Sequence, residues 1–124
     1  MVKILFVEPD KSLGLVYKKY FSEMKYSVGW EQSADDAIKS IDKNCPDILV
    51  LELQITNHNG LELLYEVRSY PEWNDIKIIL YTNIPESRLL KSPVYKLLNI
   101  HKYLYKPSST LTELAECIKL ASAK

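Results

Sequence analysis

The feature that most constrains this chain is a regular alternation between short apolar runs and segments with helical spacing. Strand-like runs fall at residues 2–7, 26–32, 47–53, 76–81 and 102–105. Between them, apolar side chains recur every three or four positions, which is typical of helices with one buried face. Strands that alternate with helices predict a parallel sheet covered on both faces and joined by right-handed crossovers.

The length fixes the scale of this architecture. With 124 residues, the chain has the size of one domain, and we predict a single domain over residues 1–124. Five strands at this length favour an α/β, flavodoxin-like, doubly wound five-stranded parallel sheet of order 2-1-3-4-5, written (βα)5. Between the last two strands we expect an irregular stretch and then a short helix, with Ser92 as its cap and Pro93 at its first position.

Charge and composition exclude several classes of protein. Sixteen Lys and Arg balance sixteen Asp and Glu, so no net field attracts nucleic acid or an anionic membrane. No apolar run is long enough to cross a bilayer and no signal peptide is recognisable, so we expect a cytoplasmic protein. The three glycines cannot form a dinucleotide or Walker loop, and Cys45 and Cys117 are expected to be free thiols.

Polar side chains follow the predicted strands where a ligand of this fold would bind. In open α/β sheets that place is outside the carboxyl ends of the strands. There the sequence has Glu8, Glu52, Thr82 and Lys106. Buried carboxylates need partners, so we expect Lys106 to pair with Glu52. Asp10 has two interpretations, a third acid of the pocket or the cap of the first helix.

These residues resemble the receiver domain of two-component response regulators, over almost the whole chain. The matching positions are Glu8, the run from Glu52 to Gly60, Thr82, and Lys106 with Pro107. The resemblance implies a signalling module rather than an enzyme. It places Glu52 at the phosphoacceptor position, makes Thr82 and Lys106 the phosphoryl contacts, and makes Tyr103 the switch aromatic. Tyr103 fits equally well as a half-buried strand aromatic.

Two positions depart from the family pattern. Conventional receivers have Asp where this chain has Glu52, and a second acid where it has Pro9. Mg²⁺ requires oxygen ligands in near-octahedral geometry, and proline offers no side-chain oxygen. Glutamate is longer by one methylene, and a misplacement of about 1 Å can cost on the order of 100-fold in rate. We therefore expect an atypical receiver with no cofactor and a degenerate Mg²⁺ site.

Several functions follow from this interpretation. The leading hypothesis is a phosphorylation-independent regulatory module that binds other proteins. The alternative is a conventional phosphorelay receiver that accepts a phosphoryl group from a histidine kinase at a non-standard site. An FMN carrier is disfavoured, because Glu8 and Asp10 would repel its phosphate. Whether Glu52 mimics the active or the inactive state stays open, as does whether an output domain follows.

The resemblance also implies where a partner would bind. In receivers the face formed by the fourth helix, the fifth strand and the fifth helix commonly binds a protein partner or a second copy. Tyr95, Tyr103 and Tyr105 fall in or beside this region, and tyrosine is favoured at interfaces. The same tyrosines would fit equally well as packing at the edge of the sheet.

Overall fold

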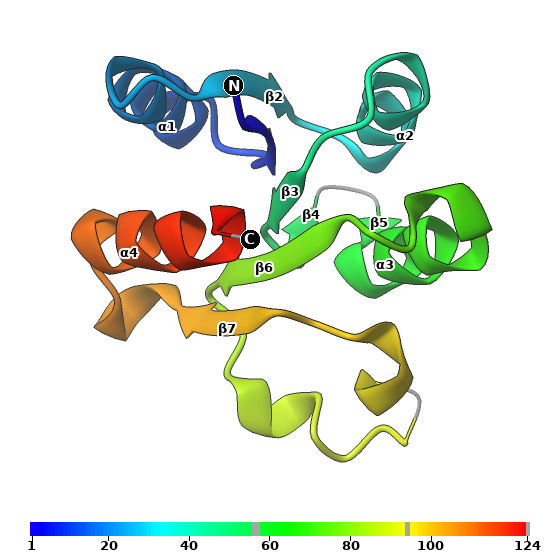
Figure 1. Cartoon of the computed structure of the whole chain (residues 1–124). Helices are drawn as coiled ribbons and strands as arrows, with labels where there is room; N and C mark the ends of the chain where they lie inside the picture. The colour runs from blue at the N-terminus through cyan, green and yellow to red at the C-terminus, as the bar shows by residue number, and fades with distance from the viewer. Residues whose placement is uncertain (56–57, 94, 124) are drawn as a thin grey trace.

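The computed structural model describes residues 1–55, 58–93 and 95–123, and its main element is a parallel five-stranded sheet. The strands run in the order β2-β1-β3-β6-β7 (Figure 1). Their bounds are β1 (Lys3–Val7), β2 (Ser27–Glu31), β3 (Ile48–Leu51), β6 (Lys77–Thr82) and β7 (Lys102–Tyr105). Because β6 and β7 are the fourth and fifth strands of this sheet, the predicted order 2-1-3-4-5 is confirmed.

Helices cover both faces of the sheet (Figure 1). One face packs against α1 (Lys11–Glu23) and α4 (Leu111–Ser122), and the other against α2 (Ala34–Lys43) and α3 (Gly60–Ser69). Along β1, Ile4 and Phe6 point toward the first pair of helices, while Leu5 and Val7 point toward the second. Burial on both faces explains why the central strands are almost continuously apolar. None of the helices in the described ranges has the length and apolarity to cross a membrane.

Side-chain caps begin three of the helices. Asp10 Oδ1 accepts a hydrogen bond from the Leu13 backbone N–H at 3.1 Å, at the start of α1. Ser33 does the same for α2. Thr110 and Glu113 form a reciprocal capping box at the start of α4. These caps stabilise the helix starts, because they satisfy backbone donors that have no partner inside the helix.

The segment between β6 and β7 agrees with the prediction in part. It contains two short 3-10 helices, η2 (Glu86–Arg88) and η3 (Tyr95–Leu98), and its described residues form no α-helix. The short helix expected after Ser92 is present as the 3-10 helix η3, which spans Tyr95–Leu98. Among the described residues, no α-helix stands at the fourth helix position of the (βα)5 pattern. Pro85 and Pro93 have no N–H donor and restrict the residues before them. The Tyr95 N–H donates to the Ser92 carbonyl at 3.2 Å, a spacing of one 3-10 turn.

Short elements complete the connections. A hairpin of β4 (Gln54–Ile55) and β5 (His58–Asn59) follows β3, where the sequence predicts a turn from Asn57 to Gly60; Asn57 itself lies outside the described residues. Two further 3-10 helices are η1 (Pro71–Trp73), before β6, and η4 (Lys106–Ser108), directly after β7. The hairpin and η4 flank the carboxyl edge of the sheet, where the candidate site lies.

Arg68 holds the irregular segment to α3. Its guanidinium donates to the backbone carbonyls of Leu98 (2.8 Å), Asn99 (3.0 Å) and Asn74 (3.2 Å). Arg68→Ala should lower the free energy of unfolding by about 2 kcal/mol, because it removes several charge-assisted hydrogen bonds. Urea unfolding measures the loss. Arg88→Ala, at an exposed position of η2, should change stability by less than about 0.5 kcal/mol; equal losses would contradict the assignment.

Candidate functional site

The carboxyl ends of the central strands bring three buried polar residues together. Glu8 follows β1, Glu52 follows β3 and Thr82 ends β6, and these residues are 3%, 4% and 0% exposed. Lys106 begins η4, immediately after the edge strand β7. Parallel strands end at the same edge, so residues far apart in the sequence converge there. The structure therefore unites four of the predicted site residues.

Lys106 is bound by both glutamates. Its Nζ lies 2.5 Å from Glu8 Oε1 and 2.9 Å from Glu52 Oε1. The pair with Glu52 was predicted; the pair with Glu8 was not. Burial by itself would lower the pKa of Lys106, but hydrogen bonds and charges from both glutamates outweigh it, and the pKa is raised. The side chain is therefore an ammonium ion at neutral pH, and it also lies 5.6 Å from the centre of the Tyr81 ring.

Five donors from the described part of the chain bind the Glu52 carboxylate. Oε1 accepts from Lys106 Nζ, from the Asn83 backbone N–H at 3.2 Å and from Asn83 Nδ2 at 3.3 Å. Oε2 accepts from the Gln54 N–H at 3.0 Å and from the Thr82 hydroxyl. A carboxylate has about four lone-pair sites, so this one is saturated. Gln54 and Asn83 were not predicted, and two of their three donors are backbone groups that residue type does not reveal.

Glu8 is fixed from its own loop and from α1, whereas Asp10 lies outside the pocket. Glu8 Oε2 accepts from the Asp10 N–H at 3.2 Å, and Oε1 accepts from the Tyr17 hydroxyl at 3.4 Å. Burial, followed by the charge of Glu8, raises the pKa of Tyr17, so the phenol stays a donor. Asp10 is exposed and caps α1, which corrects its assignment to the acidic pocket and confirms the capping interpretation.

Two side chains at the end of β2 hold the loop that contains Glu8 and Pro9. Trp30 Nε1 donates to the Glu8 carbonyl at 2.9 Å, and Gln32 Nε2 donates to the Pro9 carbonyl at 3.0 Å. The indole packs directly on Gly14, where an added Cβ would lie 1.9 Å from a ring carbon. Gly14 is thus needed for close approach, and Trp30 positions Glu8. Neither role was predicted, because both depend on contact between β2 and α1.

Tyr103 is linked to Glu52 through the chain after β6. Its hydroxyl donates to the Ile84 carbonyl, and the Ile84 N–H donates to Thr82 Oγ1 at 3.2 Å. The Thr82 hydroxyl in turn donates to Glu52. Burial raises the pKa of Tyr103, which keeps its phenol protonated. The Tyr103 ring is half-buried, as its interpretation as a strand aromatic expects.

Other candidates from the sequence lie apart from this site. Tyr95 is buried and donates its hydroxyl to Glu86, whereas Tyr105 is 37% exposed. Cys45 and Cys117 are free thiols, as expected.

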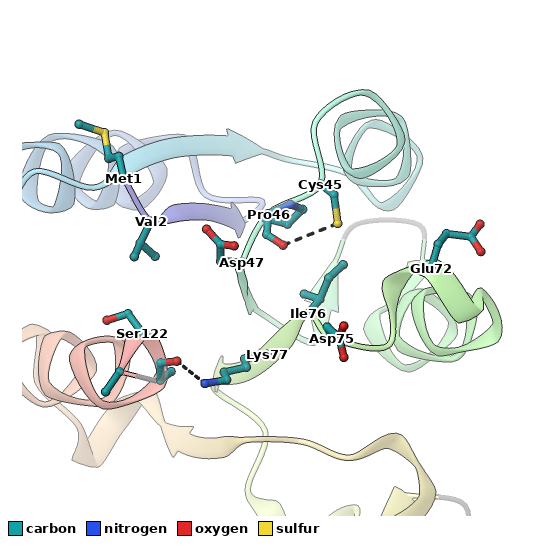
Figure 2. Close-up of a pocket in the computed structure, with 12 residues that line it drawn as sticks. Met1, Val2, Cys45, Pro46, Asp47, Glu72, Asp75, Ile76, Lys77 and Ser122 are labelled. Carbon is teal, nitrogen blue, oxygen red and sulfur yellow. Dashed lines mark hydrogen bonds between the residues drawn. The ribbon is translucent and has the colours of Figure 1, made fainter.

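A groove of about 600 Å³ lies at the opposite, amino-terminal edge of the sheet (Figure 2). Asp47, Glu72, Asp75 and Lys77 line it, and Lys77 Nζ donates to the Ala121 carbonyl at 2.5 Å. This groove is separate from the candidate site, because Glu8, Glu52, Thr82 and Lys106 do not line it.

Comparisons with known proteins agree with the observed fold. The structure of the non-phosphorylated HemR receiver domain from Leptospira biflexa superposes on this chain with a TM-score of 0.83 at 24% identity. The superposition covers 100% of this chain and 97% of that one. The response regulator protein TrrA from Thermotoga maritima, solved in complex with Mg(2+)-BeF, superposes with a TM-score of 0.81 at 25% identity. That superposition covers 98% of this chain and 99% of TrrA.

A curated relative and a family profile complete these comparisons. The transcriptional regulatory protein MalR of Bacillus subtilis is 31% identical over 81 residues, 64% of this chain; this chain spans only about a third (34%) of MalR's length. The profile of the response regulator receiver domain matches residues 4–119. Because this match covers most of the chain and agrees with its fold, the chain belongs to the response regulator receiver domain family.

Proposed function

We propose that this receiver domain regulates by binding other proteins, without a phosphoryl group or Mg²⁺, and that Glu52 holds its site in one arrangement. One observation carries the proposal. Thr82 and Lys106, which correspond by resemblance to the residues that contact a phosphoryl group, already bind the Glu52 carboxylate. The side chain at the phosphoacceptor position thus occupies the donors that a phosphoryl group would need.

The residues present do not fit Mg²⁺. Pro9 offers no side-chain oxygen, Asp10 caps α1, and Glu8 and Glu52 both bind the Lys106 ammonium. Within the described residues, no group of three His, Cys, Asp or Glu side chains is arranged to hold a metal. Mg²⁺ needs several oxygen ligands at short distances, so it would first have to displace an ammonium ion from both carboxylates.

The same arrangement disfavours phosphoryl transfer to Glu52. An attacking oxygen must be free and aligned with the phosphorus, and both oxygens of Glu52 are engaged by donors. Glu52 supplies about one negative charge, whereas a phosphoryl group carries nearly two. The carboxylate therefore replaces part of the phosphoryl group's interactions, which supports a fixed state rather than a switchable one.

A titration tests this proposal. We expect ¹⁵N–¹H correlation spectra to show no saturable shift near Glu8, Glu52, Thr82 and Lys106 up to about 10 mM Mg²⁺, nor after addition of beryllofluoride, a stable mimic of an acyl phosphate. Ca²⁺ at equal ionic strength is the control for general charge effects. Saturable shifts at these four positions would overturn the proposal and favour the conventional phosphorelay receiver.

A further inference from the structure

We infer that the carboxyl ends of all five strands form one coupled unit, in which Trp30 on the edge strand β2 controls how Lys106 binds Glu52. Trp30 is a positioning residue, because it acts on the candidate site through Glu8. This role rests on the proposed function, since it names a route by which a change at β2 reaches Glu52 without a phosphoryl group.

Hydrogen bonds from β2 fix the backbone of Glu8. Trp30 Nε1 donates to the Glu8 carbonyl at 2.9 Å, and the Glu8 N–H donates to the Glu31 carbonyl at 3.0 Å. The next residue is held in the same way, since Gln32 Nε2 donates to the Pro9 carbonyl at 3.0 Å. The indole of Trp30 is therefore the side chain of β2 that binds Glu8 directly.

The packing of the indole fixes its direction. The ring lies on Gly14 of α1, where an added Cβ would be 1.9 Å from Trp30 Cε2. On this face of the sheet, Trp30 also packs against the core cluster that contains Tyr17 and Phe21 of α1. A close-packed ring has few other positions, so its N–H stays aimed at the Glu8 carbonyl.

The side chain of Glu8 carries this position across the sheet. Its Oε1 lies 2.5 Å from Lys106 Nζ, which lies 2.9 Å from Glu52 Oε1. Glu52 Oε2 accepts from the Thr82 hydroxyl. In the order β2-β1-β3-β6-β7 (Figure 1), each strand or the residue directly after it contributes one member: Trp30, Glu8, Glu52, Thr82 and Lys106. The polar contacts are therefore continuous from one edge of the sheet to the other.

Burial makes this series of contacts sensitive to small displacements. Glu8 and Glu52 are 3% and 4% exposed, so water does not replace a lost partner. Hydrogen bonds weaken steeply when their angles change. Since two carboxylates share the Lys106 ammonium, a shift of Glu8 changes the position of that ammonium relative to Glu52.

Trp30→Phe tests the first contact, because it removes the indole N–H and keeps an aromatic ring on Gly14. We expect the Lys106 ammonium protons to exchange with water at least about fivefold faster, since Glu8 loses a bond that holds it. The Asn83 amide, which donates to Glu52, should shift in ¹⁵N–¹H spectra. The matched control is Trp73→Phe, the same change at the second tryptophan of the chain, which packs on the opposite face of the sheet. It should leave both signals unchanged.

Two further variants show whether Trp30 acts through Glu8. In a Glu8→Gln background, which keeps the side-chain length and removes the charge, Trp30→Phe should no longer shift the Asn83 amide. Gly14→Ala should shift that amide in the otherwise natural chain, because its Cβ displaces the indole while the N–H is retained. Alanine favours a helix more than glycine does, so α1 is not weakened by the change itself.

Several results would overturn the inference. Equal effects of Trp30→Phe and Trp73→Phe would show a general loss of stability. An Asn83 shift that persists in the Glu8→Gln background would show another route, and unchanged exchange at Lys106 would show that Trp30 does not position Glu8. Saturable Mg²⁺ and beryllofluoride binding with intact coupling would remove the proposed function alone; an inert metal site without coupling would remove only this inference.

Discussion

Replacing Lys106 with methionine is expected to lower the free energy of unfolding by about 3–5 kcal/mol, because it leaves two buried carboxylates without their shared counter-charge. Glu8 and Glu52 are 3% and 4% exposed, so water cannot compensate for the lost ammonium. Methionine keeps the length of the stem, so the loss comes from charge rather than from volume. Urea unfolding at neutral pH measures it.

Two further variants make this result specific. Lys102→Met, at an exposed position of β7, should change stability by less than about 0.5 kcal/mol. Adding Glu52→Gln to Lys106→Met should recover part of the loss, because one of the two uncompensated charges is removed. If Lys106→Met cost no more than Lys102→Met, the two ion pairs would have no role in stability.

The double variant Pro9→Asp with Glu52→Asp is expected to bind Mg²⁺ in the millimolar range, whereas we expect no Mg²⁺ binding by the natural chain. Asp at position 9 supplies the missing oxygen ligand, and Asp at position 52 is shorter, so it withdraws from Thr82 and Asn83 and leaves an oxygen for the cation. Amide shifts near Glu8 and Lys106 in a Mg²⁺ titration measure the gain.

Asp10→Asn provides the control for this gain of binding. Asparagine caps helices as well as aspartate does, so α1 keeps its start while the carboxylate is removed. The double variant should bind Mg²⁺ equally well with Asp or Asn at position 10. Mg²⁺ binding that depends on Asp10 would contradict its assignment as a cap, and a double variant without Mg²⁺ binding would show that other residues exclude the ion.

The main gap in the predicted fold is the segment between β6 and β7. Pro93 after Ser92 is a common helix start, yet the chain forms 3-10 turns held by Arg68. Pro85 and Pro93 disfavour a longer helix in this segment, and the sequence itself reveals this. The contacts of Arg68 could not be predicted, because Arg68 lies on α3, 30 residues before its acceptor Leu98.

The candidate site could be predicted in part, for a similar reason. Glu8, Glu52, Thr82 and Lys106 follow apolar strands, and the topology brings the ends of those strands together, so the Glu52–Lys106 pair was predictable. The second pair, between Glu8 and Lys106, joins residues 98 positions apart and depends on how far one side chain reaches. The position of Asp10 was decided by the capping geometry of α1.

The sequence by itself determined the five-stranded parallel sheet, its order and the residues that end its strands, because the periodicity of apolar residues and the rules of strand connection leave few alternatives. Only the tertiary structure decided which donors surround Glu52, that Trp30 packs on Gly14, and that the described residues of the last crossover form 3-10 turns. These features depend on backbone donors and on contacts between distant elements, and neither is encoded in the local pattern of residue types.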